Sequence, residues 1–277
     1  MNDLPKDYVE EYKQAQLDKY PGMDVSNIHI PLVIAKRIVE EGEANAIAMA
    51  EGEATAKTEA ANDPSIKLPN FRSMRFLQGK AWKAWLARDG DLIMSLVGHE
   101  ERGRLLKDNI LAFLSVGIYE AALHKTFIHG PHLKNAEWKD FFSVADLQKL
   151  RALGEPLPER PITVYRGVTC SKFGPRGMSW TANPNTAAWF ASRYPVAGRT
   201  PAVYSLLVRP DQILYMTNAR KEEEVVIAVW MCGKAKRLRP MPLSIKPGGD
   251  EEDKGVIHRA PVDPEYIMAL LRQAQVF

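Results

Sequence analysis

The sequence predicts an α+β protein, with a helical N-terminal half followed by a compact mixed β-sheet core. Apolar residues recur at helical spacing over much of the first 155 residues, and short apolar runs typical of strands follow residue 160. The stretch 154–161 separates the two patterns, because its three prolines in eight residues cannot continue a helix. Helices first and strands second favour an α+β architecture.

Charge and composition divide the 277 residues into three expected parts. Residues 1–65 form an acidic helical arm, in which residues 1–63 carry 6 Lys and Arg against 13 Asp and Glu. Residues 66–155 form a helical region, and residues 156–277 form the core. Residues 161–277 carry 16 Lys and Arg against 10 Asp and Glu, so this basic part is the better place for an anionic ligand.

Helical periodicity defines the elements of the N-terminal half. A helix is expected from Pro31 to Asn62. Its part at 43–56 is rich in Ala and Glu, so it has little to bury and is expected to project or to be partly ordered. Residues 71–88 are basic and amphipathic, and packing of their Trp-containing face on the core is favoured over contact with nucleic acid. Residues 101–126 predict one buried core helix.

After the proline-rich stretch, the pattern predicts short strands and two helices. The strands are expected at 162–165, 177–181, 202–209, 212–215 and 224–231. The helices are expected at 186–194, with Asn185 or Thr186 as its N-cap, and at 264–276.

Several classes of site are disfavoured. Cys170 and Cys232 are too few for a four-cysteine zinc site or a disulfide framework. Three histidines between residues 124 and 132 lack the spacing of a helical zinc motif and a completing carboxylate, so no metal site is predicted. The N-terminus shows no secretory signal, and the apolar segment 110–123 is too short and polar to span a bilayer. We therefore expect no membrane partner, and a protein that is cytoplasmic or delivered into a host cell without a classical signal peptide.

Two polar pairs in the strand-rich part have the spacing of a site. Side chains two apart on a strand point to one face, so Glu222 and Glu224 can face one cleft. Two close carboxylates repel, and one can then have a raised pKa and act as acid or base. Ser179 and Thr181 flank Trp180 in the same way, and their hydroxyls can orient a carboxylate or bind a ribose.

Two cationic pieces complete the set. Arg166 follows an apolar strand and can bind a phosphate, while Gly167 lets a ligand approach the backbone. Phe190 and Arg193 lie three apart on a helix end, so a ring for a planar heterocycle and a guanidinium for a phosphate share a face. Taken singly, each piece has an ordinary structural explanation, as a turn, a strand or a packed helix.

The order of the four pieces resembles the mono-ADP-ribosyltransferases of the Arg–Ser–Glu class, which include bacterial toxins and phage enzymes that modify host proteins. The resemblance covers residues 161–231 and implies an ADP-ribosyltransferase-type core with NAD as co-substrate. Two features depart from the family pattern. Its Ser-Thr-Ser motif reads Ser179-Trp180-Thr181 here, and the gap from Arg166 to Ser179 is short.

The resemblance also assigns roles to residues. Glu224 is implied to be catalytic, Ser179 to position it, and Glu222 to act on an arginine acceptor. The residues implied to bind NAD are Arg166, Gly167, Ser179, Thr181, Phe190 and Arg193.

The implied reaction cleaves the nicotinamide–ribose bond of NAD and transfers ADP-ribose to a reactive arginine of a host protein, a glycosyl transfer that needs no metal. Three alternatives stay open. Glu224 could serve simple NAD hydrolysis or transfer to a nucleic-acid base. The chain could be a non-catalytic phage or virion structural protein that keeps the fold. It could also bind nucleic acid through residues 71–88.

Overall fold

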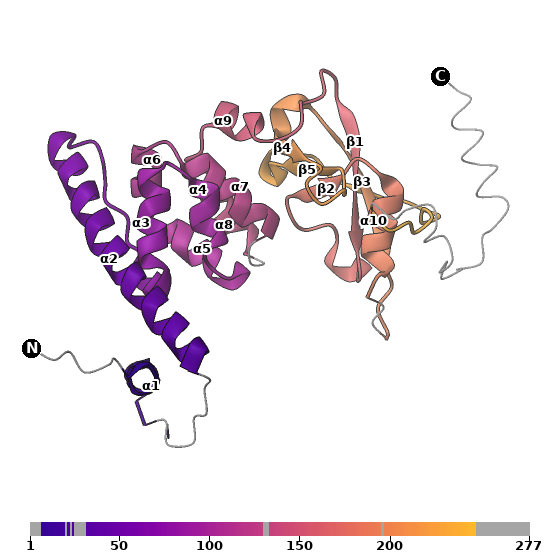
Figure 1. Cartoon of the computed structure of the whole chain (residues 1–277). Coiled ribbons are helices and arrows are strands. Elements are labelled where there is room, and N and C mark those ends of the chain that lie inside the picture. The colour runs from indigo at the N-terminus through magenta and orange to yellow at the C-terminus, as the bar shows by residue number, and fades with distance from the viewer. Residues whose placement is uncertain are drawn as a thin grey trace, which may run out of the picture. The chain divides into compact units, whose positions relative to one another are not determined.

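The computed structural model describes residues 7–19, 21–22, 24, 32–129, 133–194 and 197–247. The chain forms two compact units, Met1–Leu133 and Lys134–Phe277 (Figure 1). The first unit is helical and the second contains a six-stranded sheet, so the predicted α+β class is confirmed. The proline-rich stretch lies within the second unit, and the helix expected at 264–276 lies outside the described residues.

The described part of the first unit consists of helices. They are α1 (Tyr8–Lys19), α2 (Leu32–Asn62), the 3-10 helix η1 (Arg72–Leu77), α3 (Gln78–Leu86), α4 (Gly90–Ser95), α5 (His99–Asp108), α6 (Ile110–Ser115) and α7 (Tyr119–His129). Within the described ranges, no helix has both the length and the apolar character needed to cross a membrane.

Small residues allow α2 and α3 to pack closely side by side (Figure 1). A Cβ on Gly52 of α2 would lie 2.5 Å from Cβ of Trp82, and a Cβ on Gly79 of α3 would collide with the carbonyl of Asn45. Only Ala48, Gly52 and Ala56 are buried within residues 43–56, so this part has little to bury, as expected. The expectation that it projects is wrong, because its small residues are the contact surface with α3. Trp82 and Trp85 are buried, which confirms that the Trp face of residues 71–88 packs inside the unit.

The single helix expected at 101–126 is wrong, since α5, α6 and α7 replace it. Asn109, which is 2% exposed, lies between α5 and α6 and interrupts the helix there. Its amide donates to the carbonyls of Leu105 (2.9 Å) and Asn70 (3.2 Å), as Asn side chains do when they compete with helical hydrogen bonds. Gly117 lies between α6 and α7 and interrupts the helix with φ +74°, a conformation that glycine adopts without steric cost.

The second unit contains two helices and then the sheet with its covering helix. The elements are α8 (Asn135–Ser143), α9 (Leu147–Ala152), β1 (Ile162–Val168), η2 (Ser171–Phe173), β2 (Ser179–Thr181), α10 (Pro184–Ser192), β3 (Ala202–Val208), η3 (Pro210–Gln212), β4 (Ile213–Thr217), β5 (Glu224–Ile227), η4 (Val229–Met231) and β6 (Lys236–Arg237). Arg151 of α9 donates to the carbonyls of Ile213 (2.7 Å) and Leu214 (3.2 Å) in β4, so α9 is joined to the sheet.

The strand order is β4-β5-β2-β1-β3-β6, and every neighbouring pair is antiparallel. The expectation of a mixed sheet is thus wrong, because strand periodicity indicates which face is buried but not the direction of the neighbouring strand. All five predicted strands form, with altered bounds. β1 is longer than expected because it pairs with β3 along its whole length, and β5 is shorter because residues 229–231 turn into η4.

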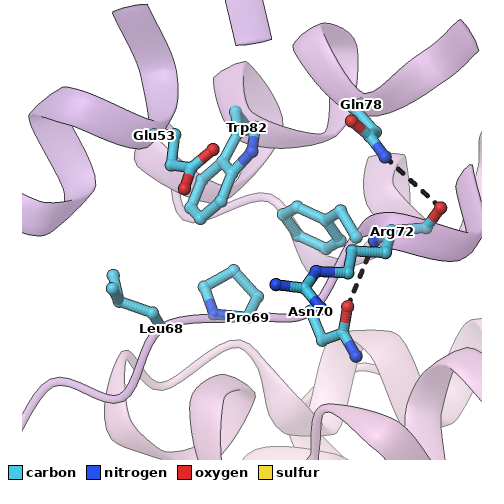
Figure 2. A pocket seen from close by; sticks show the side chains of 8 residues that line it. Glu53, Leu68, Pro69, Asn70, Arg72, Gln78 and Trp82 are labelled. Carbon is cyan, nitrogen blue, oxygen red and sulfur yellow. Dashed lines mark hydrogen bonds between the residues drawn. The ribbon is translucent and has the colours of Figure 1, made fainter. Parts of the chain in front are cut away.

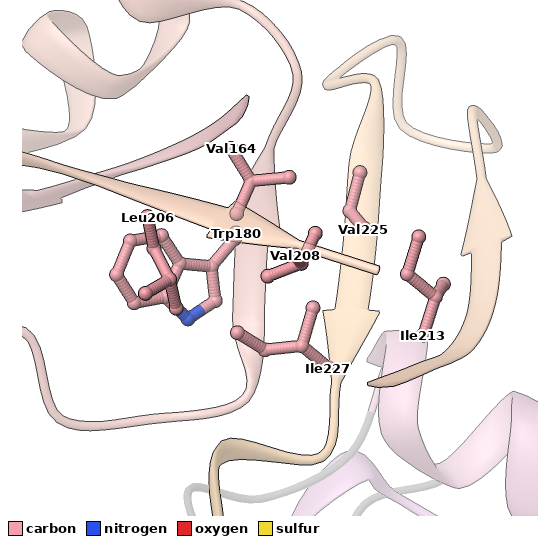
Figure 3. Close-up of a cluster of buried hydrophobic side chains, with 7 residues drawn as sticks. All are labelled: Val164, Trp180, Leu206, Val208, Ile213, Val225 and Ile227. Atoms are coloured by element: carbon pink, nitrogen blue, oxygen red, sulfur yellow. The ribbon is translucent and has the colours of Figure 1, made fainter. Parts of the chain in front are cut away.

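One face of the sheet carries a closed apolar cluster (Figure 3). Its buried members are Val164, Trp180, Leu206, Val208, Ile213, Val225 and Ile227. On the opposite face, α10 packs its alanines against β1 and β3. Gly167 of β1 allows this approach, because a Cβ there would overlap the carbonyl of Ala187.

The start of α10 differs from the prediction. The N-cap is Asn183, and its side chain accepts from the backbone N–H groups of Asn185 (2.9 Å) and Thr186 (3.4 Å). Pro184 then occupies the first turn, where a missing N–H costs nothing.

Replacement of Gly52 by Ala should separate α2 from α3, because the new Cβ would overlap Trp82. We expect Gly52→Ala to lower the unfolding free energy by about 1–3 kcal/mol, measured by urea denaturation. Gly42→Ala is the matched control in the same helix, since a Cβ there meets nothing within 4 Å, and it should raise stability by about 0.5–1 kcal/mol. Equal effects of the two variants would contradict the close packing.

Candidate active site

The candidate site lies on β2 and β5, which are neighbours in the middle of the sheet. Thr181 pairs with Glu224, and Ser179 lies two positions further along the same face of β2. Trp180 and Val225 point to the other face, into the apolar cluster of Figure 3. The prediction that two hydroxyls share one face while Trp180 packs on the other is confirmed.

Glu224 is the buried carboxylate of the site, at 3% exposure. The hydroxyl of Ser179 donates to its Oε1, although the two residues are 45 positions apart in the chain. Arg220 Nη2 donates to its Oε2 at 2.8 Å. A carboxylate is retained in such a place only with hydrogen-bonded or charged partners, and these two side chains supply them.

Glu222 lies near Glu224, but not through the strand alternation that was predicted. β5 begins at Glu224, and Glu223 has φ +48°, so strand alternation does not apply to the preceding residues. The two carboxylates are joined instead by Arg220, whose Nη2 also lies 3.0 Å from Glu222 Oε2. Glu223 is exposed and accepts from Asn183 Nδ2 at 3.2 Å, so it faces away as expected.

The charge balance around Glu222 changes its pKa. Burial raises the pKa of this carboxyl above its usual value, the guanidinium of Arg220 lowers it, the negative charge of Glu224 raises it, and Arg193 lowers it. The net direction is upward. A carboxylate with a raised pKa beside a second carboxylate is suited to proton transfer.

Arg166 supports β2 from the neighbouring strand. Its Nη1 donates to the backbone carbonyl of Ser179. Gly177, with φ +128°, makes room for the guanidinium, because a Cβ there would lie 2.6 Å from Arg166 Nη2. Burial lowers the pKa of Arg166, while Glu224 raises it. Arg166 thus places a cation near the buried carboxylate, and its contact with a phosphate stays a prediction.

Arg193 presents a second cation at the end of α10. Its guanidinium carbon lies 4.5 Å from the centre of the Phe190 ring and 5.0 Å from those of Trp189 and Tyr194. The expected common face of Phe190 and Arg193 is confirmed. Arg193 is exposed, and in the described part of the chain no carboxylate lies within 4.0 Å of it. A stacked cation without an ion pair can accept an anionic group.

Two further predicted site residues have structural contacts. The hydroxyl of Thr181 donates to the carbonyl of Glu222 (2.7 Å) and accepts from the N–H of Asn183 (3.1 Å), so it holds the loop before β5. Gly167 faces α10. Ligand contacts of Thr181 and Gly167 stay predictions.

Arg220 is the site residue that sequence reasoning missed. The sequence places two cations and three carboxylates together at 220–224, and charge alone does not indicate which of them pair. The turn decides this, with Lys221 (φ +58°) and Glu223 (φ +48°) in the left-handed region. Basic character just before paired carboxylates was the available signal.

The first unit contains a separate cavity of about 350 Å³ (Figure 2). It is lined by Glu53, Leu68, Pro69, Asn70, Phe71, Arg72, Gln78 and Trp82. This wall, half polar and half apolar, lacks the paired carboxylates and the hydroxyl of the sheet site. Over the described ranges, no three His, Cys, Asp or Glu side chains gather to hold a metal ion, and His132 lies outside those ranges.

Comparisons with known protein families, curated proteins and solved structures found no match to this chain. The function must therefore be inferred from the site itself.

The raised pKa of Glu222 can be tested by NMR titration of its side-chain carboxyl. Arg220→Ala should raise this pKa further, because the neighbouring cation is removed. Glu224→Gln should lower it, because the like charge is removed. Glu223→Gln, at the exposed neighbour, serves as the control and should leave it unchanged. Shifts in the same direction for the first two variants would contradict the charge balance described above.

Proposed function

We propose that the protein is an NAD-dependent mono-ADP-ribosyltransferase that cleaves the nicotinamide–ribose bond and transfers ADP-ribose to an arginine of a host protein. The observation that carries this proposal is the hydrogen bond from Ser179 to Glu224. It joins two distant motifs in the relation that the resemblance to the Arg–Ser–Glu class requires. The proximity of Glu222 adds the second carboxylate.

Two cations are suited to the pyrophosphate of NAD. Arg193 is exposed and stacked on aromatic rings, so its guanidinium is pre-oriented, and no carboxylate of the described residues lies within ion-pair distance of it. The half-buried Phe190 beside it offers an aromatic surface for a planar ring. Arg166 donates to the backbone carbonyl of Ser179 and adds positive potential to the same region.

Glu224 is placed to assist departure of nicotinamide. Cleavage of the bond gives an oxocarbenium-like transition state, as in glycoside hydrolysis. A fixed carboxylate in a buried site stabilises the developing positive charge strongly, because it needs no reorganisation and little water screens it. Nicotinamide leaves as a neutral base, so the step needs no general acid.

Glu222 is placed to activate the acceptor. A free arginine has a very high pKa, so it is protonated at neutral pH and is a poor nucleophile until it loses a proton. As the new C–N bond forms, Glu222 can take that proton. Arg220 already places a guanidinium within 3.0 Å of Glu222 and 2.8 Å of Glu224, so the spacing of the two carboxylates suits such an acceptor.

Glu224→Gln should abolish most of the activity, because the amide keeps the shape but removes the negative charge. We expect nicotinamide release and labelling of lysate proteins from labelled NAD to fall on the order of 100-fold or more. Glu223→Gln makes the same chemical change one residue away, on an exposed side chain, and should stay within about 3-fold of the wild type. A wild-type protein that neither labels protein nor releases nicotinamide across several lysates would refute the enzymatic function. Salt-sensitive binding of nucleic acid would then favour a nucleic-acid-binding protein that acts through residues 71–88.

Glu222→Gln should separate transfer from cleavage. Nicotinamide release should persist, since Glu224 and Ser179 are retained, while labelling of protein should fall by about 10-fold or more, since the base is lost. The ratio of label to released nicotinamide measures the effect. An equal loss of both would remove the acceptor role of Glu222, and a wild type that only hydrolyses NAD would indicate a glycohydrolase.

A further inference from the structure

Arg220 covers the carboxylate on which the proposed reaction depends. The Arg220 side chain is 38% exposed, whereas that of Glu224 beneath it is 3% exposed. Solvent therefore reaches the guanidinium but hardly the carboxylate.

Both oxygens of Glu224 are already engaged. Ser179 donates to Oε1 and Arg220 to Oε2. The hydrogen bond of Ser179 lies along the sheet, between two neighbouring strands, and is part of the rigid scaffold. The contact of Arg220 comes from a turn, so Oε2 is the oxygen that can be freed.

The turn that carries Arg220 is held without its side chain. The N–H of Lys221 donates to the carbonyl of Asn218 (2.8 Å), and the N–H of Glu223 donates to Asn218 Oδ1 (3.1 Å). The Arg220 guanidinium forms its ion pairs with the two carboxylates of the site and also interacts electrostatically with Tyr215. It can therefore swing toward solvent while the turn keeps its backbone hydrogen bonds.

We propose that Arg220 occupies the acceptor position in the substrate-free protein and determines acceptor specificity, because only another guanidinium can take its place. This proposal rests on the function proposed above. Departure of Arg220 leaves two adjacent carboxylates, one of them buried, without their ion-pair partner. An acceptor guanidinium restores both ion pairs, whereas water or a hydroxyl group restores neither. Arg220 thus restrains NAD hydrolysis until an acceptor is bound.

The competition between Arg220 and the acceptor predicts a specific kinetic pattern. An internal group that fills the acceptor position reduces the apparent affinity of the acceptor by the fraction of open protein. Removal of Arg220 should therefore lower the KM for the acceptor with little change in kcat. A residue that only positioned Glu224 would instead lower kcat when removed.

Steady-state transfer to agmatine, a small guanidine compound, tests this pattern. Arg220→Ala should lower the KM for agmatine about 5-fold or more, keep kcat within about 3-fold, and increase NAD hydrolysis in the absence of agmatine. Arg220→Lys keeps the positive charge but not the guanidinium shared by the two carboxylates. Its KM for agmatine should lie between those of the wild type and Arg220→Ala. Lys221→Asn removes one positive charge from the same turn, in a residue type that tolerates a left-handed backbone, and should match the wild type.

Two kinetic results would overturn the role of Arg220. One is a fall in kcat at unchanged KM in Arg220→Ala, and the other is a Lys221→Asn variant that reproduces the change in KM. Calorimetry with agmatine and no NAD separates this proposal from the proposed function. Arg220→Ala should bind agmatine more tightly than the wild type, and adding Glu224→Gln should remove this gain in affinity. If Arg220→Ala gains no affinity for agmatine, Arg220 does not occupy the acceptor position. If the wild type releases no nicotinamide, the proposed enzymatic function is refuted instead.

Discussion

The neutralisation of one buried carboxylate organises the second unit. Glu224 lies in a central strand at 3% exposure, where an unpaired charge would strongly destabilise the fold. Ser179 from the adjacent strand and Arg220 from the preceding turn provide its hydrogen bonds. The pairing of β2 with β5 and the turn before β5 bring these two partners to the carboxylate.

The sheet holds site residues that are far apart in the sequence at fixed positions next to each other. Antiparallel pairing of β2 with β5 sets Thr181 opposite Glu224, and the apolar residues on the reverse face lock this register. A shift by one residue would expose Trp180 and bury Ser179 in the apolar cluster. The rigid part of the site is thus stabilised by hydrophobic packing, while its adjustable part, Arg220, sits on a turn outside the strands.

The same charge balance serves both the resting protein and the proposed reaction. A guanidinium lies between Glu222 and Glu224 in the structure, and a guanidinium is the proposed acceptor. Catalysis then requires exchange of one cation for another rather than creation of a new charge, which avoids exposing two carboxylates to each other. The cations Arg166 and Arg193 act on the two carboxylates only at longer range, since neither forms an ion pair with them among the described contacts.

The sequence by itself determined the α+β class, the extent of α2, the faces of β2 and the shared face of Phe190 and Arg193, because periodicity directly records local geometry and burial. The sequence indicated a site containing Ser179 and Glu224 only through the order of the motifs. Tertiary structure decided the antiparallel direction of every strand pair, the helix break at Asn109 and the pairing of Arg220. These features depend on a strand, a loop carbonyl or a turn conformation that a local pattern does not record. A charged cluster in sequence specifies its members, and only the folded backbone specifies which of them meet.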